Sequence, residues 1–157
     1  MLKEMRRKDR QMSDEDTKTL LKNTNYGILS TVGKDNVPYG VPISFAYNGQ
    51  VIYLHGAMEG HKLDNIAHNN HVCFTVVDNN YVELLPSEFS TNYKSAVVFG
   101  TISIVEDMEE KQKALEATIE KYSHDFYDKG LKYINSALKA TKVLKIEIIK
   151  MTGKTKQ

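Results

Sequence analysis

The segment Ile52–Leu63 reads Ile-Tyr-Leu-His-Gly-Ala-Met-Glu-Gly-His-Lys-Leu and predicts a β-strand that leads into a helix. β-Branched and aromatic residues at its start favour the strand, and Gly56 and Gly60 bracket a short connection. His61 and Lys62 then fall in the first turn of the helix, where free backbone N–H groups and the helix dipole favour an anion. Two potentially cationic side chains there oppose the dipole. A bound phosphate would resolve this conflict, and an ordinary solvated helix surface, on which a first-turn lysine costs little, is the alternative.

Alternating apolar residues on both sides of this segment predict further strands. The expected strands are Tyr26–Val32, Val37–Tyr47, Gln50–His55, His71–Val77, Tyr81–Leu85, Ser95–Glu106 and Val143–Met151. Turn residues join most of them directly, and Asn48-Gly49 is the strongest hairpin signal. Because few crossover helices separate the strands, an antiparallel barrel is favoured over a doubly wound parallel sheet. Gly100, inside the longest strand, predicts a bulge or a bend.

Helical patterns flank these strands. The expected helices run from Ser13 to about Asn23, from Gly60 to about Asn69, from Asp107 to Tyr122 and from Tyr127 to Ala140. Ser13 is followed by acids, which is typical of a capped helix start. The segments Pro86–Asn92 and Thr152–Gln157 are polar and are expected to be a loop and a tail. The fold class is therefore mainly β, a barrel with flanking α-helices, in one domain over residues 1–157 with an N-terminal arm at 1–12.

Two prolines mark an unusual strand. Pro38 and Pro42 lie in the second expected strand, and neither can donate a hydrogen bond to a ladder. The backbone of Val41, Pro42, Ile43 and Ser44 is therefore partly free to face something other than another strand. A planar ligand that hydrogen-bonds to main-chain atoms would satisfy this backbone, and so would the edge of a barrel.

Composition excludes several classes of function. The chain has 21 basic and 20 acidic side chains and a formal charge of +1, which argues against nucleic-acid binding through a broad basic surface. A short basic cluster in residues 3–10 predicts a solvated arm or one that docks on a partner. No apolar run is long enough for a membrane span or a signal peptide, so a cytoplasmic location is expected. Cys73 lies in a strand-like run and is expected to be a buried, inert thiol.

His55 is the best candidate for a catalytic residue. It ends a strand immediately before the glycine-lined turn, where a proton donor would border a ligand cleft. A half-buried histidine bonded to a loop carbonyl is the alternative. No metal site is expected, because the histidines lack a recognised ligand spacing. No nucleophile elbow is present either, so an enzyme of this sequence would rely on a bound cofactor.

Several segments, in order along nearly the whole chain, resemble one known family. They are Met5–Arg10, Gly27–Thr31, Pro38–Ile43, Tyr53–Ala57, Gly60–Leu63, Val72–Phe74, Tyr93–Gly100 and Thr152–Lys154. This set is similar to the nitroimidazole-resistance (Nim-type) branch of the pyridoxamine 5'-phosphate oxidase-like flavoproteins. The resemblance implies an antiparallel, Greek-key-like split barrel that forms a homodimer, with FMN in clefts at the subunit interface.

The resemblance also implies roles for individual residues. Lys62, with His61 beside it, would hold the FMN phosphate, although many relatives carry arginine where His61 stands. Leu63 would belong to the same cofactor-binding segment. The isoalloxazine ring would be bordered by Val41, Pro42, Ile43, Ser44, Tyr53, Leu54 and His55. Tyr93, Lys94 and Ser95 would reach the flavin from the partner chain. His55 occupies the position suggested to be catalytic in Nim-type reductases.

This chain differs from part of the family in the segment expected to bind the substrate. Pyridoxamine 5'-phosphate oxidases proper bind substrate through a C-terminal segment with arginine and tryptophan, whereas this chain has no tryptophan. The resemblance therefore implies an FMN-dependent oxidoreductase that acts on a small electron-poor substrate, such as a nitroaromatic or nitroimidazole. The alternative is a non-catalytic module that binds FMN or haem for storage, sensing or stress response.

Overall fold

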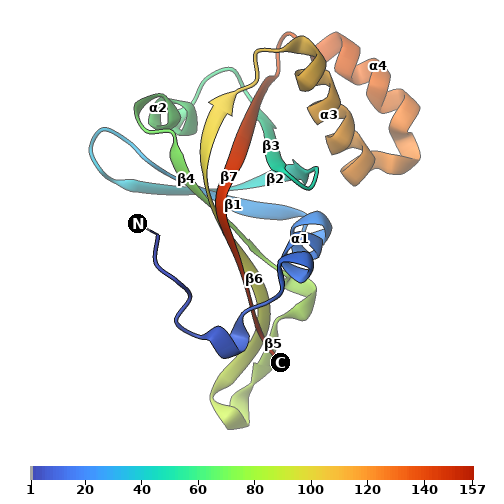
Figure 1. Ribbon diagram of the computed structural model, residues 1–157. Helices are drawn as coiled ribbons and strands as arrows, with labels where there is room; N and C mark the ends of the chain where they lie inside the picture. The colour runs from blue at the N-terminus through green and yellow to red at the C-terminus, as the bar shows by residue number, and fades with distance from the viewer. Residues whose placement is uncertain (1) are drawn as a thin grey trace.

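A closed ring of antiparallel strands forms the centre of the computed structural model, which describes residues 2–157 (Figure 1). The strands are β1 (Tyr26–Val32), β2 (Pro38–Tyr47), β3 (Val51–Gly56), β4 (His71–Val77), β5 (Glu83–Leu85), β6 (Ser90–Ile104) and β7 (Lys142–Lys156). They are ordered β4-β1-β2-β3-β7-β6-β5, and an additional β4–β6 pairing closes the ring. The predicted antiparallel barrel is confirmed.

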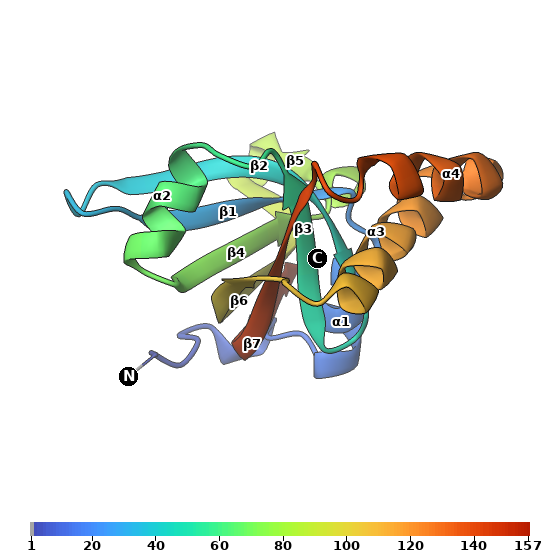
Figure 2. The same ribbon diagram turned by 90° about the horizontal axis from the view of Figure 1, so that it is seen from above.

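Helices cover parts of the outside of this barrel (Figures 1 and 2). They are α1 (Asp14–Asn23), α2 (His61–His68), α3 (Met108–Ser123) and α4 (Tyr127–Ala137), with short 3-10 turns η1 (Lys8–Arg10), η2 (Asn79–Tyr81), η3 (Pro86–Glu88) and η4 (His124–Phe126). The Ser13 side chain accepts from the Asp16 N–H, so the predicted cap of α1 is confirmed. Within residues 2–157, no helix is both long and apolar enough to cross a membrane.

Two apolar clusters result from the alternation of side chains along the strands. Residues that point into the ring form the main core, in which Phe45 and Phe74 pack edge to face with centroids 4.9 Å apart. A second cluster lies outside the ring, where Val143 of β7 packs with Leu115 of α3 and Ile134 of α4. Helices α3 and α4 are therefore fixed to the outer surface of the barrel.

The ends of β6 and β7 were predicted wrongly. β6 begins at Ser90 and not at Ser95, and β7 continues to Lys156, so the expected polar tail is a strand. The two polar segments pair with each other, as in Tyr93↔Lys156, and the ladder satisfies their backbone groups. No hydrophobic alternation marks them in sequence. The result is a long β6–β7 ribbon that extends beyond the barrel (Figure 1).

The N-terminal arm lies along this ribbon in its own chain. Gln11 forms a β-bridge with Lys154, and the Met12 N–H donates to the Gly153 carbonyl at 3.0 Å. Closer to the start of the chain, Lys150 Nζ donates to Glu4 Oε1 at 2.9 Å. Backbone and ionic contacts therefore hold this segment against β7, while most of its side chains remain exposed.

The predicted irregularity at Gly100 is also confirmed. The register of β6 and β7 shifts between Phe99 and Gly100, as in a β-bulge. A Cβ atom at Gly100 would lie 2.4 Å from the Glu147 carbonyl oxygen, which leaves no room for a side chain. The bulge lies within the ring, because Gly100 is also the partner of Val72 in β4.

Candidate functional site

The main-chain edge of β2 is the first part of the candidate site. β2 pairs with β1 from Pro38 to Ser44, but it pairs with β3 only from Phe45 to Tyr47. The other edge of β2 before Phe45 therefore has no strand neighbour among the described residues. This is the segment that the prolines marked in the sequence, and it holds free backbone groups beside the end of β3.

The start of α2 supplies a cation near that edge. Gly60, with a φ of 138°, precedes the helix and provides no side-chain cap. The first N–H groups of a helix have no partner within the helix. Lys62 Nζ lies 3.5 Å from the position a Cβ would take at Gly56, so the lysine folds back over the end of β3. Within residues 2–157, no carboxylate lies within 4.0 Å of this ammonium group.

His55 immediately precedes Gly56, the residue over which Lys62 folds. Its Cα partner is Val143, so its side chain is on the outer face of the barrel. His55 Nδ1 is buried and has no hydrogen-bond partner among the described residues. Burial lowers the pKa of His55 below its ordinary value of 6.5, so the imidazole is neutral at pH 7. A buried polar atom without a partner is costly and indicates a missing hydrogen-bonding group.

His61 is exposed and has a different environment. Its ring lies 4.2 Å from the ring of Tyr39, centroid to centroid, at 34°. The imidazole therefore packs across from β2 to α2 at the edge of the candidate site. Leu63, the third residue of the predicted phosphate segment, packs against the main core and fixes the first turn of α2 on the barrel.

The other predicted flavin neighbours divide into two groups. Leu54 is buried in the core, and Val41 and Ile43 pack against it, so only their main chains face outward. Pro42 and Ser44 are exposed.

The Tyr53 side chain bonds to a residue of α3. Its hydroxyl donates to Glu110 Oε1 at 2.9 Å, and Lys145 Nζ donates to the same carboxylate at 2.9 and 3.2 Å. Burial, and then Glu110, raise the pKa of Tyr53 to about 12. The phenol therefore connects β3 to α3 in a structural network.

Two residues that sequence reasoning missed lie beside Ser44. The Tyr122 hydroxyl accepts from the Phe45 N–H at 3.0 Å, and Lys121 Nζ donates to the Thr24 and Phe45 carbonyls at 2.6 and 3.0 Å. They fill the gap where β1 and β2 separate after Ser44. In the sequence both residues are ordinary members of an amphipathic helix, and no local signal distinguishes them.

Tyr93, Lys94 and Ser95 lie in the part of β6 that pairs with the end of β7. The β6–β7 ribbon extends away from α2 (Figure 1). Residue alternation places Tyr93 and Ser95 on one face of the ribbon and Lys94 on the other. Lys94 and its cross-strand partner Thr155 line a cavity beneath α1. One protomer therefore does not bring these three residues to Lys62.

The described residues contain no group of three or more His, Cys, Asp or Glu side chains with metal-binding geometry. A family model for pyridoxamine 5'-phosphate oxidase matches residues 13–155. The chain belongs to the pyridoxamine 5'-phosphate oxidase family. The matched range contains all the strands and helices from β1 to α4 and all the candidate site residues.

Solved structures agree with membership of the pyridoxamine 5'-phosphate oxidase family. The chain is 28% identical to a protein from Bacteroides thetaiotaomicron that is provisionally assigned to 5-nitroimidazole antibiotic resistance, with a TM-score of 0.79 over 92% of this chain and 86% of that one. A conserved hypothetical protein from Mycobacterium tuberculosis matches at 18% identity and a TM-score of 0.81, over 97% of this chain and 90% of that one. A FAD and heme binding protein from Mycobacterium smegmatis matches at 24% identity and a TM-score of 0.81, over 94% of this chain and 74% of that one.

The last two similarities show the shared split-barrel fold alone. No curated protein gives a significant match to this chain.

Proposed function

We propose that the protein is an FMN-binding flavoprotein that reduces small electron-poor compounds such as nitroaromatics. The observation that carries this proposal is the unpartnered Lys62 ammonium at the start of α2, next to the free edge of β2 and the unsatisfied Nδ1 of His55. The first of these groups suits the phosphate of FMN, and the other two suit the isoalloxazine ring or a substrate beside it.

The phosphate fits the first turn of α2. Lys62 provides a charge-assisted contact, and the free N–H groups of the helix provide donors aligned with the dipole. A Cβ atom at Gly56 would lie in ordinary van der Waals contact with the Lys62 side chain, so the lysine lies directly beside the end of β3. The match between charge, donors and space supports Lys62 as the phosphate-binding residue.

The isoalloxazine ring fits the backbone of Val41–Ser44. The ring carries both hydrogen-bond donors and acceptors along one edge, as a main chain without a strand neighbour does. His55 Nδ1 has no partner among the described residues, and in this proposal the cofactor or the substrate supplies one. FMN, when bound, supplies the electrons, while these residues orient the ring and His55 holds a proton for the reduced nitro group.

A homodimer is part of the proposal. Tyr93 and Ser95 lie on the β6–β7 ribbon, which extends away from α2 (Figure 1), and in this proposal a second copy brings them to the flavin that Lys62 holds. An apolar groove of about 540 Å³ on the outer surface of β1, β4, β6 and β7 gives a surface suited to a second copy. Cys73 is half-buried in that groove and would become inaccessible in the dimer.

The substrate class rests on two observations. The similar protein from Bacteroides thetaiotaomicron is provisionally assigned to nitroimidazole resistance, and this chain lacks tryptophan, which the oxidases proper use for pyridoxamine phosphate. The name of the Mycobacterium smegmatis protein favours one alternative, in which the chain binds flavin or haem without turnover.

The visible absorption spectrum of the purified protein, with and without added FMN, tests the proposal together with its mass in solution. A flavin spectrum on a dimer, with bleaching by a reductant and recovery on addition of a nitroaromatic, is the expected result. Bound flavin that does not react with any acceptor would favour the non-catalytic alternative. A colourless protein that does not bind FMN would refute the cofactor assignment.

A further inference from the structure

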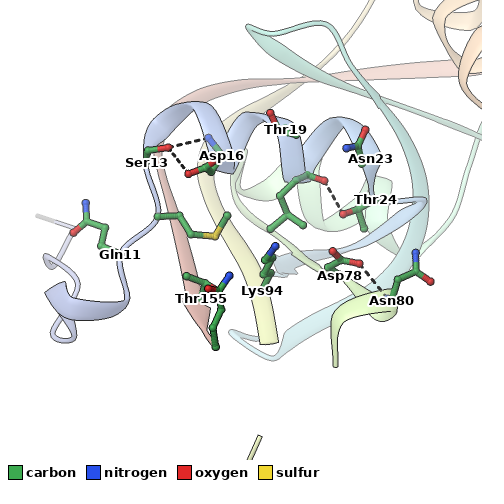
Figure 3. A pocket seen from close by; sticks show the side chains of 13 residues that line it. Gln11, Ser13, Asp16, Thr19, Asn23, Thr24, Asp78, Asn80, Lys94 and Thr155 are labelled. Carbon is green, nitrogen blue, oxygen red and sulfur yellow. Dashed lines mark hydrogen bonds between the residues drawn. The ribbon is translucent and has the colours of Figure 1, made fainter. Parts of the chain in front are cut away.

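The two faces of the β6–β7 ribbon differ in what they present. Lys94 and Thr155 line the cavity beneath α1 (Figure 3). Because side chains alternate along a strand, the neighbours of these two residues lie on the face away from α1. That face carries Tyr93, Ser95, Lys154 and Lys156, with Tyr93 opposite Lys156 and Ser95 opposite Lys154 in the ladder. It is the face that the proposed function brings to the flavin of a second copy.

The N-terminal arm adds another cation beside this face. Gln11 forms a β-bridge with Lys154, so the arm runs along the edge of β7 and places Arg10 next to the ribbon. Arg10, Tyr93 and Lys154 therefore come from three separate segments of the chain, and only the folded protein brings them together. All three side chains are partly exposed, so a molecule in solution can reach them.

Tyr93 is the side chain on which both cations converge. Lys154 Nζ lies 5.7 Å from the centre of the Tyr93 ring. Burial raises the pKa of the Tyr93 hydroxyl, but Lys154 and Arg10 lower it more, by hydrogen bonding and by charge, so the pKa falls below its ordinary value of 10. Both positive groups must lie close to one hydroxyl to have this effect. The three side chains therefore form one cluster.

The positive charge of this cluster is not neutralised by the chain itself. Asp9, the acid next to Arg10 in the sequence, accepts instead from Arg7 Nε at 2.8 Å. Within residues 2–157, no carboxylate lies within 4.0 Å of the Arg10 guanidinium or the Lys154 ammonium group. Like charges that share one neighbour repel each other. A bound anion would remove this repulsion and use the donors of all three side chains.

We propose that Arg10, Tyr93 and Lys154 bind an oxyanion group, a carboxylate or a phosphate, on the compound that the flavin reduces. The guanidinium and ammonium groups donate charge-assisted hydrogen bonds to its oxygens, and the phenol donates a further one. This inference rests on the proposed function and deepens it, because it restricts the substrates to electron-poor compounds that carry negative charge. It also gives the N-terminal arm a role in substrate binding.

Calorimetric titration of the purified full chain, with and without FMN, tests recognition of the anion in the absence of turnover. The probes are para-nitrobenzoate, para-nitrophenyl phosphate and the neutral para-nitrobenzamide, which share the ring and the nitro group. We expect at least one of the two anions to bind tenfold or more tightly than the amide, and salt to reduce this preference. The tighter anion identifies the oxyanion. Equal affinity for the amide and both anions would overturn the proposal.

Two variants locate the binding in this cluster. Arg10→Gln and Lys154→Gln each remove one charge, so we expect each to weaken binding of the preferred anion tenfold or more and to leave binding of the amide unchanged. Each also removes a repulsion, so the thermal midpoint of the unliganded protein should not fall. Lys139→Gln, at an exposed lysine outside the cluster, is the control. Unchanged anion affinity in both cluster variants would refute the site, and so would equal losses for anion and amide with a lower thermal midpoint.

Turnover separates this inference from the proposed function. In Arg10→Gln we expect kcat/KM to fall for the preferred anion and to be retained for the amide. Flavin-dependent reduction of all three probes without preference would refute the anion site and leave the proposed function standing. Selective anion binding by a protein that does not take up FMN would refute the proposed function and leave the anion site standing.

Discussion

Lys62 is a single side chain on which the cofactor assignment depends. Its ammonium group has no carboxylate partner among residues 2–157, so a phosphate contact would be lost completely in Lys62→Ala. We expect a loss of about 1.5–3 kcal/mol, or about tenfold or more in FMN affinity. A fluorescence titration of apoprotein with FMN measures this, and Lys139→Ala is the control. Equal dissociation constants in variant and wild type would exclude Lys62 from the site.

His55 predicts a pH dependence for turnover. Burial lowers the pKa of this imidazole below 6.5, so its protonated form accumulates only in acid. If protonated His55 delivers the proton, turnover should rise as the pH falls through that lowered pKa. His55→Gln should retain FMN, lose most of the turnover and lose this dependence on pH. The same pH profile in His55→Gln would show that another group supplies the proton.

Lys121 predicts a pH dependence for stability. Burial lowers its pKa to about 8, from an ordinary value of 10.5. Between these values the unfolded chain binds more protons than the folded one, so the free energy of unfolding should rise with pH. Below about pH 8 both states are protonated, and this contribution is constant. Urea unfolding at several pH values should show the rise in the wild type and not in Lys121→Met; parallel curves would contradict it.

At the scale of elements, the bulge between β6 and β7 depends on one glycine. A methyl group at Gly100 would collide with the Glu147 carbonyl and with Ile146, and backbone cannot move as a flexible side chain does. We expect Gly100→Ala to reduce the free energy of unfolding by about 1–3 kcal/mol through overpacking. Gly49→Ala, at an open turn with positive φ, is a comparison that introduces strain without a clash. Chemical denaturation of the two variants separates the two effects.

An element could be predicted from the sequence where its residues show a clear pattern, such as apolar alternation along a strand. Strands with one apolar face, such as β1 and β4, were predicted with their bounds, and the prolines of β2 correctly indicated a free backbone edge. The outer half of the β6–β7 ribbon was missed because it is stabilised by ladder hydrogen bonds between polar residues. Lys121 and Tyr122 were missed because their partners are backbone groups distant in sequence.

At the scale of the whole molecule, a shared flavin site predicts complementation. If each site takes Lys62 from one protomer and Ser95 from its partner, a dimer of Lys62→Ala with Ser95→Asp contains one intact site. Random pairing of co-expressed chains should then restore about one quarter of the flavin-binding sites. Each variant alone should bind little FMN. No recovery on co-expression, with dimers present by mass, would show that each site is formed within one chain.

The position of β7 in the ring bears on how the chain folds as it is synthesised. β7 is the final strand of the described chain, yet it pairs with β3 on one side and with β6 on the other. Until it emerges from the ribosome, the nascent chain holds two open strand edges that are prone to pairing with other chains. Most of the barrel can therefore form only after β7 has been synthesised. Ribosome-bound chains that stop before Lys142 should remain sensitive to protease, whereas chains extended by a linker beyond Gln157 should become resistant.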